Sequence, residues 1–202
     1  MNNKDREEAL TLEILSAIDE RSDVTQRNLA SRTGVALGLA NSYLRRCVKK
    51  GLVKIQQAPA NRYLYYLTPK GFAEKSRLTA QYLSYSFSFY RKAGESCARA
   101  FQVCGARGWQ RVGLYGASDL AEIAVIRAME TNIRIVAVCD PASSRNRILN
   151  VPVVGGVEAA GAVDAWLVTD LNQPMDARAA LSRVSPKERI VVPDILSTPP
   201  AG

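Results

Sequence analysis

Residues 111–140 read RVGLYGASDLAEIAVIRAMETNIRIVAVCD and contain two apolar runs separated by a glycine turn and a helical pattern. The first run covers residues 111–116, and residues 118–131 have the apolar spacing of a helix. The second run, residues 134–140, is apolar almost throughout, as strands buried in a parallel sheet are. This order predicts a strand, a turn, a helix and a strand, which is how a nucleotide-binding βα unit begins.

The sequence after residue 140 continues this alternation. We expect a short strand or extended loop at 151–156, a strand at 164–170, a helix at 174–184 and a final strand at 189–195. Alternating strands and helices predict a parallel, doubly wound sheet. Because this part of the chain is too short for the complete six-stranded dinucleotide fold, we expect four or five strands that form one nucleotide-binding half.

The glycine turn differs from the motif G-x-G-x-x-G at its second glycine. Gly116 keeps the tight turn, whereas Ser118 replaces the glycine that lets a pyrophosphate approach the backbone. Asp140 ends the second strand, where an acid accepts hydrogen bonds from ribose hydroxyls, and Arg145 and Arg147 follow within reach of a phosphate. The predicted cofactor-binding residues are Gly116, Ala117, Ser118, Asp119, Leu120, Asp140, Arg145 and Thr169. The alternative is a ligand-free scaffold, in which the carboxylate of Asp119 satisfies the donors of the helix N-terminus.

Positive charge is concentrated in the first half of the chain. Residues 1–92 hold 16 Lys and Arg against 8 Asp and Glu, whereas residues 93–202 hold 11 of each. From residue 24 to residue 73 there are nine cations and no carboxylate. A basic half joined to a neutral half predicts a polyanion as the partner of the basic half.

The basic half contains the pattern of a helix-turn-helix. Residues 7–20 have helical spacing, and Thr25 is a candidate N-cap for a short helix that precedes Gly34. A tight turn between helices favours glycine at such a position. The second helix follows as ALGLANSYLRRCVKKG, rich in Asn, Ser and Arg, with Ala40, Leu44, Cys47 and Val48 expected to face inward.

A predicted hairpin completes a winged helix. LVKIQQ and NRYLYYL have strand character on either side of APAN, and the tip carries Arg62. Asn41, Ser42, Arg45 and Lys49 are expected on the outward face of the second helix, where Arg and Asn read base edges in the major groove. Arg27, Arg46, Lys50, Lys54 and Arg62 are expected to contact phosphates. The predicted contacts to double-stranded DNA are Gln26, Arg27, Asn41, Ser42, Arg45, Arg46, Lys49, Lys54 and Arg62.

Residues 24–78 resemble the winged-helix domains of the MarR family, and the branch associated with exopolysaccharide gene clusters in particular. The resemblance rests on TQRNLASRTGVALGLANSYLRRCVKKGLVKI and on the closing RYLYYLTPKGFAEKSRLT. It implies a DNA-binding transcriptional regulator. One difference is Leu39, which stands where the family has a polar or basic residue on the exposed first turn of the second helix.

A long helix is predicted to connect the two halves. From Thr68 to about Gly105, apolar residues step by threes and fours through Leu78, Tyr82, Tyr85, Phe89, Ala93, Cys97, Phe101 and Cys104. A stripe of this length needs a partner surface, and a second copy of the chain is expected, which gives a homodimer with two recognition helices. Gly94 is a candidate break, because glycine is costly within a helix.

The glycine-turn region also resembles two groups of proteins. GLYGASDLAEIAVIRAMETNIRIVAVCDP is similar to the N-terminal Rossmann unit of sugar-modifying acyltransferases and to the NAD(H)-binding domain of Rex-type redox repressors. The later VPVVGG looks like a segment that both groups carry. The resemblance implies NAD(H) or a nucleotide sugar as a small nucleotide ligand, although the cofactor itself is left open.

The remaining composition indicates a reduced, cytoplasmic location. Cys47, Cys97, Cys104 and Cys139 show no paired spacing, and the chain has no histidine to complete a zinc site, so buried free thiols are expected. The N-terminus lacks the pattern of a signal peptide. No apolar run approaches the length that spans a membrane, and no membrane partner is expected.

The predicted fold class is α/β overall, with an N-terminal winged helix-turn-helix, a long linker helix and a C-terminal Rossmann-like domain with a parallel sheet. We expect a DNA-binding domain at 1–78, a linker and dimerisation helix at 79–108 and a ligand-sensing domain at 109–202. The leading hypothesis is a transcriptional regulator that senses a nucleotide-type metabolite. The alternatives are an architectural DNA-binding dimer with a ligand-free scaffold and, from another class, a nucleotide-sugar-modifying enzyme. No catalytic or metal-binding set is discernible in the sequence, so a non-enzymatic role is favoured.

Overall fold

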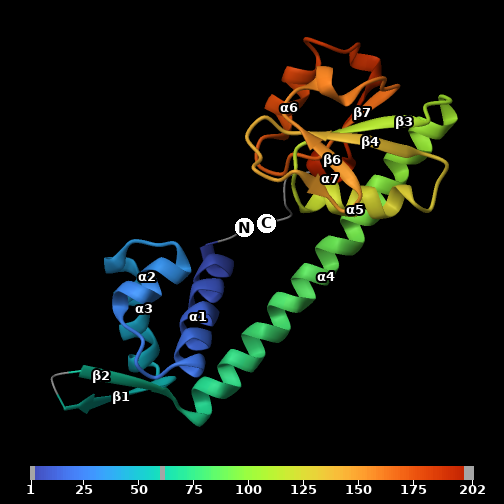
Figure 1. Cartoon of the computed structure of the whole chain (residues 1–202). Coiled ribbons are helices and arrows are strands. Elements are labelled where there is room, and N and C mark those ends of the chain that lie inside the picture. Colours follow the sequence, from blue (N-terminus) through green and yellow to red (C-terminus); the bar gives the residue numbers. More distant parts are fainter. Residues whose placement is uncertain (1–2, 60–61, 198–202) are drawn as a thin grey trace. The chain divides into compact units, whose positions relative to one another are not determined.

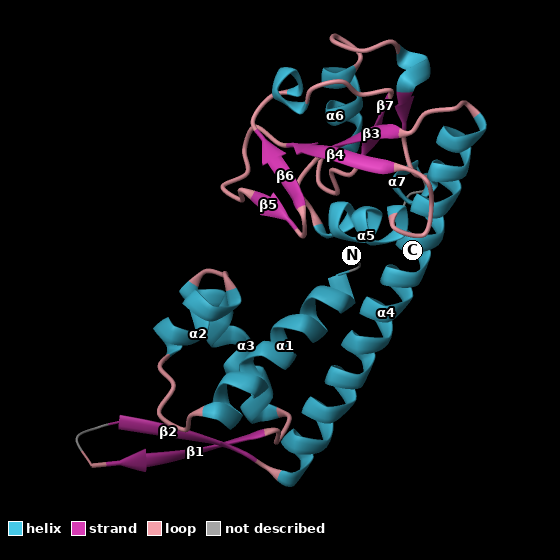
Figure 2. Cartoon of the chain, turned by 45° about the vertical axis from the view of Figure 1, so that its right-hand side comes forward, coloured by secondary structure: helices cyan, strands magenta, loops and turns pink. Residues whose placement is uncertain are grey.

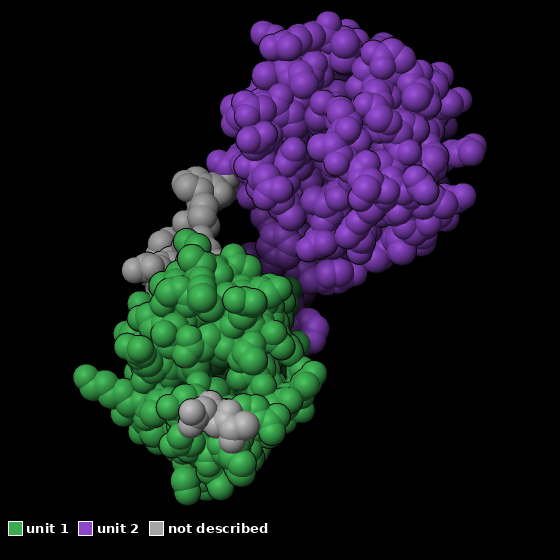
Figure 3. Space-filling view, turned by 60° about the vertical axis from the view of Figure 1, so that its left-hand side comes forward, with its two compact units in different colours: residues 1–86, 202 green, residues 87–201 purple. Residues whose placement is uncertain are grey.

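The chain divides into two compact units, with the boundary in the sequence between residues 86 and 87, and Figure 3 draws them in two colours. In the computed structural model, residues 3–59 and 62–197 are described, and their helices and strands follow one another as Figure 1 shows. The long helix α4, Pro69–Ala106, begins in the first unit and ends in the second.

Three helices form the body of the first unit: α1 (Asn3–Glu20), α2 (Gln26–Thr33) and α3 (Leu37–Lys49). Thr25 caps α2, because its side-chain oxygen accepts a 3.1 Å hydrogen bond from the backbone N–H of Asn28. Gly34 ends α2 with a φ of 64°, a left-handed conformation that favours glycine. The predicted cap and the predicted glycine turn are both confirmed.

A two-stranded antiparallel hairpin follows these helices (Figure 2). Strand β1 (Val53–Ala58) pairs with β2 (Arg62–Leu67), and Ala58 lies opposite Arg62. The predicted wing is therefore present, although its tip residues 60 and 61 lie outside the described residues. Together with α2 and α3 the hairpin makes a winged helix-turn-helix, as the sequence predicts.

Apolar residues from every element of the first unit form its core. Leu44 and Cys47 of α3 are buried as predicted, whereas Val48 is partly buried. The buried set is Ile14, Leu15, Ala17, Ile18, Val24, Leu29, Ala40, Leu44, Cys47, Leu52, Val53, Tyr65 and Leu78. Burial of the inner side of α3 leaves its other side available to a partner.

Helix α4 is continuous through Gly94, so the predicted break at this residue is wrong. Gly94 is buried, and a Cβ built there would lie 2.7 Å from Nε of Arg127. Ala93 and Cys97, on either side of it, are also fully buried in the second unit. The tertiary packing of this segment outweighs the cost of about 1 kcal/mol that glycine adds to a helix.

The second unit is built on a six-stranded mixed sheet in the order β5-β6-β4-β3-β7-β8. Its strands are β3 (Arg111–Tyr115), β4 (Arg134–Cys139), β5 (Arg147–Ile148), β6 (Val151–Val154), β7 (Ala165–Val168) and β8 (Ile190–Val191). All neighbouring pairs are parallel except β5 and β6. Taken in chain order, the parallel strands are arranged 3-2-1-4-5, which is the order of a doubly wound dinucleotide-binding sheet.

Helices cover both faces of this sheet. The end of α4, α5 (Asp119–Ala128) and α7 (Asp194–Ser197) pack on one face, around Phe101, Leu114 and Leu120. The short helix η1 (Val157–Ala160) and α6 (Pro174–Leu181) pack on the other face, around Trp166 and Leu181. This three-layer arrangement confirms the predicted α/β class for the second unit.

The sheet differs from the prediction in two respects. It has six strands within the described residues rather than four or five, because β5 adds an antiparallel edge strand to the expected parallel sheet. The final strand covers only Ile190–Val191, preceded by the short helix η2 (Lys187–Arg189) and followed by α7. Strands of two residues are too short to show the alternation on which sequence prediction depends.

The four cysteines are free and buried, as predicted. Burial raises the pKa of Cys47, Cys104 and Cys139 to about 11 each and that of Cys97 to about 12. In the described part of the chain, no helix combines the length and the apolar character needed to cross a membrane.

Candidate functional site

The predicted DNA-contacting residues lie on α2, α3 and the wing, and almost all of them are exposed. We call this set the recognition surface: Gln26, Arg27, Asn41, Ser42, Arg45, Arg46, Lys49, Lys54 and Arg62. Asn41 alone in this set is half-buried. The inward side of α3 packs in the core, so the polar side is presented outward.

Most cations of the recognition surface have no carboxylate beside them. Within residues 3–59 and 62–197, no ion pair is formed by Arg27, Arg45, Lys49, Lys54 or Arg62. The other arginines and lysines of the first unit that form ion pairs find their partners in α1, in the loop after it, or in α4, as Arg32 does with Glu20 and Lys75 with Asp19. Most ion pairs of the first unit thus lie away from the recognition surface, and among the described residues Arg62 has only the longer-range attraction of Asp23.

Arg46 is the exception on this surface. Its guanidinium lies 3.1 Å from Oε2 of Glu7, a residue 39 positions earlier in the chain. Arg46 therefore links α3 to α1, and its predicted phosphate contact stays a prediction.

The first turn of α3 exposes apolar side chains. Leu37 is 50% exposed and Leu39 is 41% exposed. In helix-turn-helix proteins, residues near the start of the second helix contact base edges. A leucine there can contact the C5-methyl group of thymine, although it cannot donate or accept a hydrogen bond.

The glycine turn lies at the carboxyl edge of the sheet in the second unit, between β3 and α5. β3 and β7 are neighbours at the point where the strand order reverses, which is where ligands bind in sheets of this type. Gly116 has a φ of 108°, and a Cβ built on it would lie 2.5 Å from the backbone nitrogen of Asp170. Asp170 is the second residue after β7, and the glycine motif of the sequence does not point to it.

Hydrogen bonds join the turn to the segment after β7. Ser118 Oγ donates to the carbonyl oxygen of Thr169 at 2.5 Å, and Thr169 Oγ1 donates to the carbonyl oxygen of Gly116 at 2.7 Å. Ser118 Oγ also accepts from the backbone N–H of Leu120 at 3.1 Å, so Ser118 rather than Asp119 caps α5. The Ser118 hydroxyl, which could bind a phosphate on the evidence of the sequence alone, thus already forms two hydrogen bonds within the protein.

Asp140 meets the turn from the end of β4. Its Oδ2 accepts a 2.8 Å hydrogen bond from the backbone N–H of Ala117, and its Oδ1 accepts one of 3.0 Å from Ala142. The carboxylate is therefore fixed in orientation, and each oxygen keeps acceptor capacity for a ribose hydroxyl. All the predicted cofactor-binding residues except Arg145 thus lie together at the glycine turn, because they are either neighbours in the sequence or joined to the turn by hydrogen bonds.

The carboxyl edge is acidic. Asp119, Glu122, Asp140 and Asp170 surround the turn, and the nearby Arg145 forms a 2.9 Å ion pair with Glu122. Burial raises the pKa of Tyr115, and the adjacent acidic groups Cys139, Asp140 and Asp170 raise it further. The charge of a pyrophosphate at this turn would meet these carboxylates, and the N–H groups of Ala117 and Leu120 already donate to Asp140 and Ser118.

No metal site accompanies the turn. Among the described residues, no group of three or more Cys, Asp or Glu side chains is arranged to hold a metal ion.

Arg147, which the sequence places near a phosphate, donates a 2.6 Å hydrogen bond to the carbonyl oxygen of Asn150.

Comparison with known families supports the nature of the first unit. Residues 8–54 match the family described as winged helix-turn-helix DNA-binding. The match covers most of α1, all of α2 and α3, and the first residues of β1. A DNA-binding winged helix-turn-helix in the first unit is therefore shown, whereas membership of the MarR branch stays a prediction. None of the curated proteins compared with the chain matches it.

Two solved structures illustrate the similarity at the level of the whole chain. Human N-acetylserotonin methyltransferase in complex with SAM is 12% identical, with 94% of this chain and 76% of that chain covered and a TM-score of 0.37. PigF with SAH is 14% identical, with 94% of this chain and 56% of that chain covered and a TM-score of 0.25. Similarities this low support no statement about ligand or activity.

Proposed function

We propose that this protein is a transcriptional regulator that binds double-stranded DNA through its winged helix. The observation that carries the proposal is the set of five exposed cations without ion pairs on α2, α3 and the wing. They lie within the segment from residue 24 to residue 73, which contains no carboxylate. Phosphates would supply the missing negative charge and release the counterions of DNA.

The two parts of the recognition surface have different roles in this proposal. Helix α3 enters the major groove, where Arg45 and Asn41 read base edges by hydrogen bonds. Arg27, Lys54 and Arg62, on α2 and the wing, contact phosphates and fix the position of α3. The base contacts determine the operator sequence, and the phosphate contacts determine the dependence of affinity on salt.

The protein binds its operator as a homodimer in this proposal. Tyr82, Tyr85 and Phe87 of α4 are 59%, 61% and 63% exposed, and Leu83, Phe89 and Tyr90 are exposed beside them. Contiguous exposed apolar surface of this kind marks a protein interface. Because both copies carry the same helix, a two-fold contact buries the aromatic residues of both and presents two recognition helices to two half-sites.

The second unit senses a small metabolite in this proposal. Ligand and DNA would be linked, since a ligand that changes the affinity for DNA has its own affinity changed by the same factor. A nucleotide at the glycine turn is one candidate, supported by the strand order and by the fixed carboxylate of Asp140. The acidic edge favours a ligand that presents its ribose rather than its phosphates to the turn.

Binding to the promoter of its own operon tests the DNA-binding proposal. The double variant Arg45→Ala with Arg62→Ala should bind at least tenfold more weakly by fluorescence anisotropy, because a bidentate base contact by Arg45 contributes about 1–3 kcal/mol and Arg62 adds a phosphate contact. It should also reduce the slope of log affinity against log salt by about 1 for each phosphate contact that it removes.

A matched control separates this effect from a general loss of charge. Arg178 and Arg183 are exposed arginines of the second unit, and neither forms an ion pair within the described residues. The variant Arg178→Ala with Arg183→Ala should bind DNA as the wild type does. Unchanged affinity of the Arg45 and Arg62 variant would contradict the proposed docking of α3 and the wing.

A further inference from the structure

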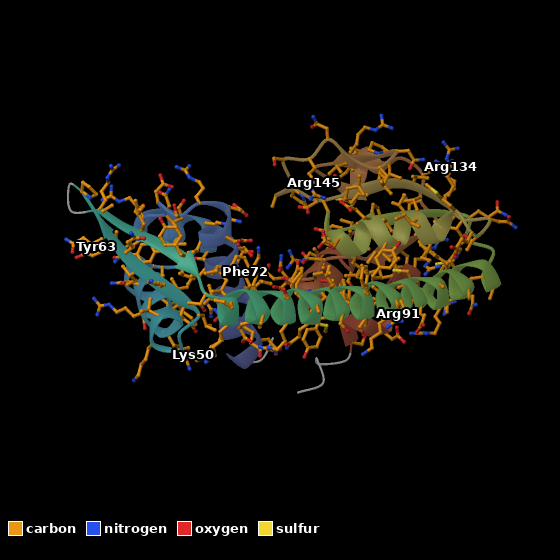
Figure 4. All side chains as sticks on the ribbon, turned by 90° about the horizontal axis from the view of Figure 1, so that it is seen from below. Lys50, Tyr63, Phe72, Arg91, Arg134 and Arg145 are labelled. Atoms are coloured by element: carbon orange, nitrogen blue, oxygen red, sulfur yellow. The ribbon has the colours of Figure 1, made fainter. Side chains whose placement is uncertain are left out.

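A cavity of about 420 Å³ lies at the amino-terminal edge of the sheet, away from the glycine turn. Arg111 and Arg134, the first residues of β3 and β4, line it together with Asn150 at the turn between β5 and β6. Its apolar wall includes Ala128 and Met129 at the end of α5. Arg134 and Arg145 lie at opposite edges of the second unit (Figure 4), so the cavity is separate from the acidic edge.

The cavity exists because β4 and β6 diverge. These strands pair only at Val138 and Cys139 of β4, so the first part of β4 has no partner strand on this side. The pairing of β4 with β3 also shifts, since Val112 pairs with Ile135 and Gly113 with Ala137, which leaves Val136 as an extra residue. Val136 lines the cavity. Bulges of this kind recur next to functional sites, where they redirect a strand.

The hairpin that closes the cavity contains a strained residue. Leu149 has a φ of 51°, the one positive φ of a residue other than glycine in the described chain. It lies between β5 and β6, directly before Asn150, and its side chain is exposed. A conformation of this type is unfavourable for leucine, and such strain is concentrated at ligand sites. Here it places Asn150 at the cavity.

Two positive charges stand side by side at this cavity. Arg111 and Arg134 are register partners on adjacent parallel strands, and neither forms an ion pair within residues 3–59 and 62–197. Asp164 is the nearby carboxylate: its Oδ2 accepts hydrogen bonds from the backbone N–H groups of Gln110 and Arg111, and its pKa is lowered by these bonds and by the charges of Arg111 and Arg189. Like charges on adjacent strands repel, and an anion between them relieves the repulsion.

We infer that this cavity binds a small organic anion whose carboxylate or phosphate group is held by Arg111 and Arg134 and whose short apolar body packs against Ala128 and Met129. The cavity volume lies in the range of small-molecule sites, and its lining is mostly polar with a smaller apolar part, which suits an anion with a short apolar body. The inference deepens the proposed function, because it names the ligand class that the second unit would sense, and it rests on that proposal only for the effect on DNA.

Thermal stability of the purified full-length protein at low salt tests this binding without DNA. The probes are hexanoate, hexyl phosphate and the neutral hexanol, each at the same concentration. We expect a concentration-dependent rise in the melting temperature of the second unit with at least one of the two anions and a smaller rise, or none, with hexanol. Which anion gives the larger rise distinguishes a carboxylate ligand from a phosphate ester.

Variants locate the binding. The double variant Arg111→Gln with Arg134→Gln should lose the response to the anions, because it removes both charges from exposed positions and retains the fold. The control Arg178→Gln with Arg183→Gln removes equal charge from exposed positions outside the cavity lining and should respond as the wild type does. An equal response to hexanol and the anions, or a full response in the Arg111 and Arg134 variant, would overturn the inference.

The same variants separate this site from the DNA interface. If the Arg111 and Arg134 variant loses the anion response and still binds the promoter, the anion site and the DNA interface are distinct, as we infer. If the wild type responds to the anions and does not bind DNA, the site stands and the proposed regulator fails. Absence of any anion response in a protein that binds DNA would overturn the site alone.

Discussion

The side-chain hydroxyl of Thr169 donates a 2.7 Å hydrogen bond to the carbonyl oxygen of Gly116 across the point where the strand order of the sheet reverses. Thr169 is fully buried, and its own carbonyl oxygen accepts from Ser118. In dinucleotide-binding sheets this position is an open crevice for the ligand. Here it is bridged by protein hydrogen bonds, so the turn contributes to the stability of the second unit.

Gly116→Ala should strongly destabilise the second unit. Its φ of 108° is unfavourable for alanine, and the added Cβ would lie 2.5 Å from the backbone nitrogen of Asp170. Left-handed strain and a backbone clash together predict a loss of about 2–5 kcal/mol in the free energy of unfolding. Trp109 and Trp166 are the two tryptophans of the chain, and both lie in the second unit. Tryptophan fluorescence in urea therefore measures this unit.

Gly105→Ala is the matched control for this measurement. Gly105 lies within α4, and a Cβ built there meets no atom within 4 Å. Alanine should leave stability unchanged or raise it by about 0.5–1 kcal/mol, because it lowers the entropy of the unfolded chain. Equal stability of both variants would show that the turn is not held as the structure describes.

The four thiols should be unreactive in the folded protein. At pH 8 a thiol with a pKa of about 11 has roughly 100-fold less thiolate than one with the ordinary value of 9.0, and thiolate is the reactive form. Ellman's reagent should therefore react at least about 100-fold more slowly with the native protein than with the protein in guanidinium chloride. Rapid reaction of any thiol under native conditions would contradict its burial.

The same pKa values predict a loss of stability in alkali. The pKa of each thiol is higher in the folded state than in the unfolded state, so the stabilising contribution is complete below pH 9. It is lost as the pH rises from about 9 towards about 11, because only the unfolded chain releases these protons readily. Urea denaturation at several pH values between 8 and 11 measures this decrease.

Local patterns made much of the fold predictable. The cap of α2 at Thr25 and the turn at Gly34 depend on the residues themselves, and each is found where the sequence places it. The alternation of strands and helices after residue 110 likewise follows from apolar runs. The strand β5 and the short β8 could not be predicted, since two residues carry no period.

The partners within the sites were beyond prediction because they are distant in sequence. Ser118 and Thr169 are 51 residues apart, and Arg46 and Glu7 are 39 apart. No spacing rule connects such pairs. The sequence therefore predicts that the Ser118 hydroxyl and the Arg46 guanidinium bind ligands, whereas in the structure both form hydrogen bonds within the protein. The absence of ion pairs at Arg45 and Arg62 was easier to predict, because the sequence has no carboxylate from residue 24 to residue 73.

Charges on the aromatic face of α4 should dissociate the proposed homodimer. Tyr82 and Tyr85 are exposed and three residues apart, so they share one side of the helix. The variant Tyr82→Glu with Tyr85→Glu places like charges opposite one another across a two-fold contact, and sedimentation velocity should then show a monomer. Ala80→Glu with Ser84→Glu adds the same charge at exposed positions that are neither three nor four residues from Tyr82 or Tyr85, and this variant should remain dimeric. A dimeric tyrosine variant would assign the contact to another surface.

Leu39 should make operator recognition sensitive to the methyl group of thymine. It is 41% exposed on the first turn of α3, where the proposed docking brings the side chain to base edges in the major groove. Replacing thymine by deoxyuridine at each operator position in turn removes one methyl group. At the contacted position the wild type should lose about 0.8 kcal/mol, or roughly fourfold in affinity. Leu39→Ala should bind both duplexes equally, whereas Leu171→Ala, an exposed leucine of the second unit, should keep the difference. If Leu39→Ala discriminates as strongly as the wild type, the methyl group is contacted by another residue and α3 is oriented differently in the groove.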